Sequence, residues 1–89
     1  MLWSQEAWED YLHWQQTEKG LLHRVNALIA EIVRQPFAGT GQPEPLERDL
    51  AGWWSRRITR EHRLVYRVAG SGPDRYIEIA ACRYHYRRS

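Results

Sequence analysis

Hydrophobic and charged residues alternate most clearly between positions 52 and 68, and this alternation predicts a β-hairpin. In the second arm, Leu64, Tyr66 and Val68 fall on one face, whereas the other face carries two arginines. Successive side chains of a strand point to opposite faces, so this arm is expected to be half-buried with a cationic outer face.

The length of the connection between the two arms sets their register. A three-residue connection at 59–61 places Trp54 opposite Tyr66 and Arg57 opposite Arg63. A four-residue connection would set an isoleucine opposite an arginine and mix the two faces, so the hydrophobic pattern favours the shorter connection.

The expected pairing of Arg57 with Arg63 has a chemical consequence. Like charges directly opposite each other destabilise a sheet, so an anion between the two guanidinium groups is expected, and phosphate is the obvious candidate. An ordinary solvated basic hairpin is the alternative interpretation. The neighbouring Arg56 falls on the other face, together with Trp54 and Ile58.

The N-terminal stretch predicts a short strand followed by a helix. Ser4 is a candidate N-cap, because its hydroxyl oxygen can accept a hydrogen bond from a free backbone N–H of the first turn. Trp3 before the cap and Trp8 after it have the spacing of a hydrophobic staple. The strand is expected over residues 1–3 and the helix over residues 5–16.

A second helix is predicted over residues 18–34. Thr17 is its candidate N-cap, and Pro36 ends it, because the residue before a proline is pushed out of the helical region. Its apolar residues recur at helical spacing and form one stripe, which is more typical of a core than of a binding site: Leu21, Leu22, Val25, Leu28, Ile29 and Ile32. The two helices are therefore expected to pair and to lie on the sheet.

The stretch 37–50 contains several glycines and prolines without periodicity, and it predicts a loop with one turn near 46–50. Within it, Pro43 and Pro45 hold Glu44 on a stiff, extended segment, which suits a preorganised acid or base. An exposed acid in a turn is the alternative.

A final strand is predicted over residues 75–82, after a turn that contains glycine and proline, with Ile77, Ile79 and Ala81 on one face. Strict alternation would place Arg83 and His85 on the face that points to the core. The strand is therefore expected to end or bulge near Arg83, so that His85 points outward.

Composition narrows the possible classes of protein. The chain has 89 residues, enough for one domain with a modest core, and it carries 13 Lys and Arg against 11 Asp and Glu. Arginines are concentrated from residue 53 onward, which is typical of a surface that binds a polyanion. The single Cys82 leaves no internal disulfide and no cysteine-based zinc cluster, which fits a reducing cytoplasm. Neither a signal peptide nor a membrane-spanning run is predicted.

Four motifs follow one another along the chain: PEPL at 43–46, GWWSRRI at 52–58, HRLVY at 62–66 and AACRYHY at 80–86. In this order they resemble the YoeB toxins of the RelE superfamily, the ribosome-dependent endoribonucleases of bacterial toxin–antitoxin pairs. The match extends nearly end to end, from Trp3 to Tyr86. The linked order is specific, whereas no single motif would be.

The resemblance implies an α+β fold, with two N-terminal helices on a mainly antiparallel, twisted sheet as in the microbial ribonucleases. Residues 1–89 then form a single domain, with 87–89 as a short basic tail. The implied activity is cleavage of mRNA in the ribosomal decoding site, without metal or cofactor, which inhibits translation. The implied partners are the ribosome, mRNA and a YefM-like antitoxin over the basic face, and a homodimer is a further expectation.

The resemblance also assigns site residues by position. The catalytic set is Glu44, Arg63, His85 and Tyr86. The set that binds RNA is Arg57, Arg56 and Trp54. RNA cleavage by its own 2′-OH needs a base, an acid for the 5′-oxygen and a cation for the phosphate, and Glu44, His85 and Arg63 can fill these roles.

Three departures from the family pattern stand out. Glu47 replaces a lysine after the PEPL motif, which removes a cation near the expected phosphate. The turn before the last strand is longer, and residues 87–89 extend past the usual end.

Two other functions remain open from the sequence. A non-catalytic module that binds RNA or the ribosome would share the arginines and aromatic residues, but it would not need Glu44 and His85 beside one phosphate. A toxin of the same fold that inhibits a protein target, as the gyrase-directed relatives do, would typically lack the Glu, Arg and His set. Cleavage of mRNA in a translation extract separates these possibilities.

Overall fold

The computed structural model describes residues 1–84, which form α-helices, 3-10 helices and β-strands. In chain order they are β1 (Leu2–Trp3), α1 (Gln5–Thr17), α2 (Lys19–Arg34), β2 (Glu44–Pro45), the 3-10 helix η1 (Arg48–Leu50), β3 (Trp54–Arg57), β4 (Arg63–Ala69), the 3-10 helix η2 (Gly72–Asp74) and β5 (Tyr76–Ala81). No helix in this part of the chain has the length and apolarity that a membrane crossing requires.

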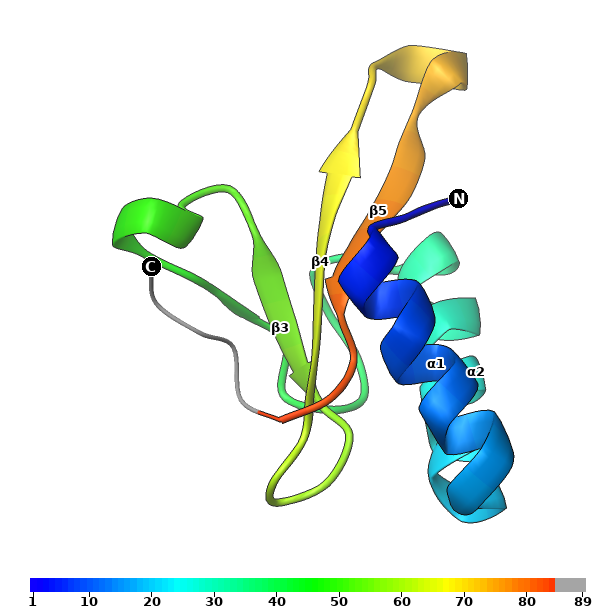
Figure 1. Cartoon of the computed structure of the whole chain (residues 1–89). Coiled ribbons are helices and arrows are strands. Elements are labelled where there is room, and N and C mark those ends of the chain that lie inside the picture. The colour runs from blue at the N-terminus through cyan, green and yellow to red at the C-terminus, as the bar shows by residue number, and fades with distance from the viewer. Residues whose placement is uncertain (85–89) are drawn as a thin grey trace.

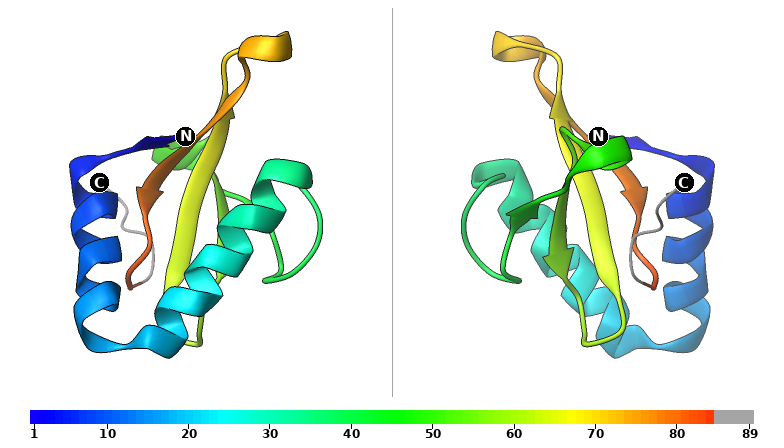
Figure 2. Two further views of the ribbon diagram at one scale, coloured as in Figure 1. Left: turned by 90° about the vertical axis from the view of Figure 1, so that its right-hand side faces the viewer. Right: turned by 90° about the vertical axis from the view of Figure 1, so that its left-hand side faces the viewer.

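The five strands form one sheet in the order β1-β5-β4-β3-β2. Every neighbouring pair is antiparallel except β1 with β5. Both helices lie on the same face of this sheet (Figure 1, Figure 2). The predicted α+β fold is therefore confirmed, and the opposite face of the sheet, called the outer face below, carries neither α1 nor α2 (Figure 2).

Helix α1 begins as its sequence predicts. The Ser4 hydroxyl accepts a hydrogen bond from the Ala7 backbone N–H at 3.0 Å and donates one to the carbonyl of Ala80 at 2.8 Å. The rings of Trp3 and Trp8 meet edge to face with their centroids 5.8 Å apart, as in a hydrophobic staple. The cap therefore also fastens α1 to β5.

The junction between the two helices differs from the prediction. Thr17 is the last residue of α1, and its hydroxyl donates to the carbonyl of His13 instead of capping α2. Glu18 is the N-cap of α2, without a side-chain hydrogen bond. The prediction of Thr17 as a cap was wrong, because one extended residue is enough to reverse the chain here.

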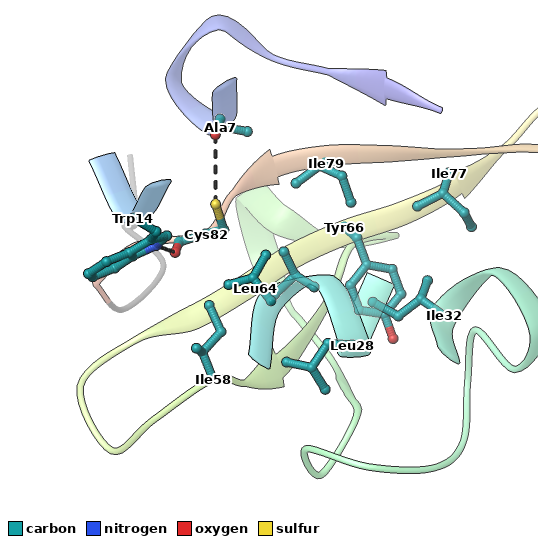
Figure 3. Packing of buried hydrophobic residues seen from close by; sticks show 11 residues of the cluster. Ala7, Trp14, Leu28, Ile32, Ile58, Leu64, Tyr66, Ile77, Ile79 and Cys82 are labelled. Atoms are coloured by element: carbon teal, nitrogen blue, oxygen red, sulfur yellow. Dashed lines mark hydrogen bonds between the residues drawn. The ribbon is translucent and has the colours of Figure 1, made fainter. Parts of the chain in front are cut away.

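The core lies between the two helices and the strands of the sheet, mainly β4 and β5 (Figure 3). Val25, Leu28 and Ile32 from the predicted stripe are at most 1% exposed, and they pack in one cluster with Leu64 and Tyr66. Burial of one such aliphatic side chain stabilises the fold by roughly 1.5–3 kcal/mol. The interpretation of the stripe as core is confirmed.

A β-bulge interrupts the pairing of β4 with β5. Val65 lies opposite Ala81, whereas the next residue, Tyr66, lies opposite Ile79, so Ala80 is an extra residue. Beyond the bulge the alternation of β5 is reversed, and Ala81 moves to the outer face. The strand prediction, which placed Ala81 with the core isoleucines, did not contain this shift.

Because of the bulge, Cys82 enters the core. Its thiol is fully buried, its Sγ–H donates to the carbonyl of Ala7 at 3.7 Å, and its carbonyl accepts from the indole of Trp14 at 2.7 Å. Burial raises the pKa of the Cys82 thiol to about 12. The predicted end of the strand near Arg83 is confirmed at Ala81, but the bulge lies earlier than expected.

Candidate functional site

The outer face of the hairpin carries a pair of arginines. Arg57 lies directly opposite Arg63, which confirms the predicted register. The Arg57 N–H donates to the carbonyl of Gly41 at 2.7 Å and the Arg63 N–H to that of Tyr84 at 2.8 Å, so the two arginines do not bond to each other through the backbone. Such a pair is the closer type in an antiparallel ladder, with Cα atoms about 4.5 Å apart. The two arginine side chains therefore leave the sheet from adjacent positions on the same face.

The guanidinium of Arg63 is partly fixed by its own hairpin. Its Nη1 donates to the carbonyls of Thr59, Arg60 and His62 at 2.7, 3.2 and 3.1 Å. Within residues 1–84 its Nε and Nη2 have no acceptor, and the side chain of Arg57 is exposed. Donors of both arginines thus stay available for an anion, which would relieve the repulsion between them.

Glu44 lies beside this pair, on the edge strand β2. It is opposite Ser55, which puts it on the outer face, one pleat away from Arg57 on the neighbouring strand. Diagonal neighbours of this kind are about 7–8 Å apart. Pro43 and Pro45 flank it, and an edge strand tolerates proline because no further strand needs the missing N–H. The extended segment around Glu44 is confirmed, whereas its pairing with β3 was not predicted.

Arg56 lies in the core, on the opposite face of β3. Its side chain is 0% exposed and forms a salt bridge with Glu31 at 2.8 Å, while its Nε donates to the hydroxyl of Tyr66 at 3.2 Å. The remaining donors bind carbonyls of the loop after α2, those of Gln35, Ala38 and Thr40. A phosphate cannot reach this guanidinium, so the prediction that Arg56 contacts RNA was wrong.

Glu31, the partner of Arg56, binds the same loop at Thr40. Its carboxylate accepts hydrogen bonds from the backbone N–H and the hydroxyl of Thr40, and these, followed by Arg56, lower the pKa of Glu31. Gly41 then passes so close to the hairpin that a Cβ there would lie 3.1 Å from the carbonyl of Arg57, and its φ is +88°. The Glu31–Arg56 pair therefore holds the loop that leads to β2.

Trp54 also lies on the core face. It is half-buried, packs against the core cluster, and its ring centroid is 4.9 Å from that of Phe37. The structure does not bring Trp54 to Arg57 and Arg63. Trp53, in contrast, lies on the outer face, and its ring centroid is 4.6 Å from the guanidinium carbon of Arg67.

The sequence contained a signal for the buried arginine. Arg56 has the same parity in the hairpin as Trp54 and Ile58, and Glu31 lies one helical turn from Leu28 in the apolar stripe. A charged residue at a core position of each element predicts a buried ion pair, which the position-by-position family assignment did not consider.

His85 and Tyr86 lie outside the residues that the structure describes. The described residues end at Tyr84, next to the arginine pair. The Tyr84 N–H donates to Nδ1 of His62 at 2.7 Å, and the Tyr84 carbonyl accepts from the Arg63 N–H. Up to Tyr84, no three His, Cys, Asp or Glu side chains are grouped so that they could hold a metal ion.

Comparison with known proteins identifies the class to which this two-helix α+β domain belongs, the toxins of bacterial toxin–antitoxin systems. The family described as "YoeB-like toxin of bacterial type II toxin-antitoxin system" matches residues 3–86. The chain belongs to this family.

Individual relatives support the assignment along nearly the whole chain. Toxin YoeB of Escherichia coli K12 is 55% identical over 86 residues, which cover 97% of this chain and 98% of the relative. A structure described as a YoeB/ParE toxin from Agrobacterium tumefaciens is 52% identical, with a TM-score of 0.91 and 96% of each chain covered. A YoeB–YefM complex from Staphylococcus aureus contains a chain that is 44% identical, with a TM-score of 0.85, covering 96% of this chain and 94% of that one.

Proposed function

We propose that this toxin is an endoribonuclease that cleaves mRNA in the decoding site of the ribosome and so stops translation in the bacterial cytoplasm. The observation that carries the proposal is the cross-strand pair of Arg57 and Arg63 on the outer face. Like charges opposite each other destabilise a sheet, so an anion between them would stabilise it, and Glu44, one pleat away, is the proposed proton acceptor.

The proposed reaction is a transesterification within the RNA. The 2′-oxygen attacks the adjacent phosphorus and gives its proton to the carboxylate of Glu44. The bond from phosphorus to the 5′-oxygen breaks, and His85 gives a proton to that oxygen. The products are a 2′,3′-cyclic phosphate and a free 5′-hydroxyl, and neither step consumes another reactant.

The remaining residues stabilise charge and hold the substrate. Nε and Nη2 of Arg63 are proposed to face the phosphate oxygens, on which negative charge grows in the transition state. Arg57, which is exposed, binds the same phosphate. Tyr86 is proposed to stack on an unpaired base at the cleavage site.

Replacing Arg63 by alanine is expected to slow cleavage about 10²- to 10³-fold, because donors aimed at developing charge contribute on this scale. Ribosome binding should fall much less. The test is single-turnover cleavage of mRNA on programmed ribosomes, with co-sedimentation to measure binding. Arg34→Ala, at the exposed end of α2, is the matched control.

The same assay separates the competing functions. Wild-type chain that binds ribosomes but leaves the mRNA intact would support a non-catalytic binding module. Inhibition of growth without either ribosome binding or cleavage would support a protein target. Either outcome would contradict the proposed activity.

We further propose that an antitoxin covers the arginine face. The S. aureus relative is found in a complex with YefM, and an acidic segment would match the charges of Arg57 and Arg63. The double substitution Arg57→Glu and Arg63→Glu is expected to weaken antitoxin binding at least tenfold, mainly through faster dissociation. Calorimetry or surface plasmon resonance would measure this.

The matched control for antitoxin binding reverses the charge of two exposed arginines outside the pair, Arg34 and Arg75. Equal affinity of the two double variants would exclude the electrostatic contribution of the arginine face. Another S. aureus structure is described as a YoeB dimer, so self-association is proposed here too, and sedimentation at several concentrations would detect it.

A further inference from the structure

The last described turn of the chain is held by an imidazole. The Tyr84 N–H donates to Nδ1 of His62 at 2.7 Å, and the carbonyl of the same residue accepts from the Arg63 N–H at 2.8 Å. These two bonds lie on either side of the Cα of Tyr84, so together they fix its backbone. The chain continues from this turn directly into His85.

The backbone of Tyr84 needs this restraint. Its φ is +61°, in the left-handed region that residues with a Cβ rarely adopt. A single residue held there persists only when its surroundings impose it. Loss of either hydrogen bond would therefore let the turn relax toward an ordinary conformation.

The contact defines the protonation state of His62. A backbone N–H can only donate, so Nδ1 must carry a lone pair, and the ring proton of the neutral imidazole is on Nε2. A proton on Nδ1 would leave two donors facing each other. The hydrogen bond from the Tyr84 N–H to His62, called the tie below, therefore forms only with the neutral ring.

The surroundings of His62 favour the neutral ring. The imidazole packs edge to face on Trp14, with centroids 4.7 Å apart, and against the ring of Tyr84 at 5.6 Å. Burial is the main cause that lowers the pKa of His62, assisted by the charges of Arg83 and His13. Glu61 and Glu18 act in the opposite direction, and the net shift is downward.

We propose that His62 is a positioning residue whose neutral form fixes the left-handed turn at Tyr84, the residue that directly precedes His85 and Tyr86 in the chain. Protonation of Nδ1 opens this turn. The effect on catalysis rests on the proposed nuclease function, whereas the tie itself does not. As the pH falls through the lowered pKa of His62, the turn is released and cleavage declines.

Two substitutions at one position test the proposal. His62→Asn places an amide oxygen where Nδ1 stands, so it keeps the acceptor but cannot titrate. In His62→Gln the amide reaches the position of Nε2, so the acceptor for Tyr84 is lost. His23→Gln, at an exposed position of α2, is the matched control.

The first measurement is independent of activity. In native protein, ¹⁵N NMR at neutral pH should show an unprotonated Nδ1 in His62. Protection of the Tyr84 amide from hydrogen exchange, relative to the intrinsic exchange rate at each pH, should be high in the wild type at neutral pH and lower at acid pH. It should be high at both pH values in His62→Asn and low at both in His62→Gln. A protonated Nδ1, or equal protection in His62→Gln, would overturn the tie.

The second measurement is single-turnover cleavage across pH. The cleavage rate of His62→Gln is expected to be on the order of 10- to 100-fold lower than that of the wild type, because misplaced reacting groups slow a reaction on this scale. His62→Asn should retain most of the rate and lack the decline that His62 causes at acid pH. If exchange confirms the tie but His62→Gln cleaves at the wild-type rate, the positioning role is wrong. If neither the wild type nor any variant cleaves mRNA, the nuclease proposal is wrong. The exchange measurement then still decides whether His62 holds Tyr84.

Discussion

Replacing Glu44 or His85 by alanine is expected to slow mRNA cleavage about 10²- to 10⁴-fold each, the usual range for one general acid or base. Without Glu44 the 2′-OH keeps its proton, and without His85 the 5′-oxygen leaves as an unprotonated alkoxide. The two substitutions act on one reaction, so the double variant should lose less than the product of the single effects. Single-turnover cleavage on programmed ribosomes measures all three rates.

The fold should survive the change at Glu44, because this side chain is exposed on the edge strand and contributes nothing to the core. Thermal melting of each variant checks this. Glu9→Ala and His23→Ala make the same chemical changes on the exposed surface of the helices. A double variant of Glu44 and His85 that melts normally and cleaves at the wild-type rate would falsify the acid–base assignment.

Replacing Arg56 by methionine is expected to lower the free energy of unfolding by about 3 kcal/mol, because it removes the donors that satisfy the loop carbonyls and the cation that Glu31 binds. Methionine preserves much of the volume, so the loss reports the hydrogen bonds to Glu31 and to the loop carbonyls rather than a cavity. For a domain of this size, such a change lowers Tm by roughly 15 °C. Urea denaturation and calorimetry would measure it.

Two comparisons sharpen the test of Arg56. Arg34→Met removes an exposed arginine from α2 and should change stability by no more than about 0.5 kcal/mol. Glu31→Gln removes the partner carboxylate, whose pKa is lowered in the fold. A lowered pKa means that its stabilisation is present above the unfolded-state pKa and is lost as the pH falls through the folded-state pKa. The Glu31→Gln variant should therefore lose less stability on acidification than the wild type, and identical pH profiles would contradict this role.

Features that depend only on residues close together in the sequence could be predicted from it. The cap at Ser4 and the stripe of Val25, Leu28 and Ile32 follow from hydrogen bonding and spacing within one helix. The opposition of Arg57 and Arg63 follows because strand alternation has a period of two, so that a shift by one residue would mix the faces.

Other features depend on segments that meet only in the folded chain. The pairing of Glu44 with Ser55 needs the loop that Glu31 and Arg56 hold, and neither β2 nor β3 encodes it alone. The bulge at Ala80 lies where β5 pairs with β4 and where the Ala80 carbonyl accepts from the Ser4 hydroxyl, and it decides that Cys82 is buried.

The sequence by itself determined the fold class, the hairpin register and the family, because periodicity and linked motifs are properties of the chain alone. The tertiary structure decided which arginines face an anion. Arg57 and Arg56 are adjacent and chemically identical, yet one is exposed and the other is fully buried. Burial of a guanidinium is stable only where acceptors surround it, and those of Arg56 come from α2, β4 and the loop after α2. Their convergence is a property of the folded molecule.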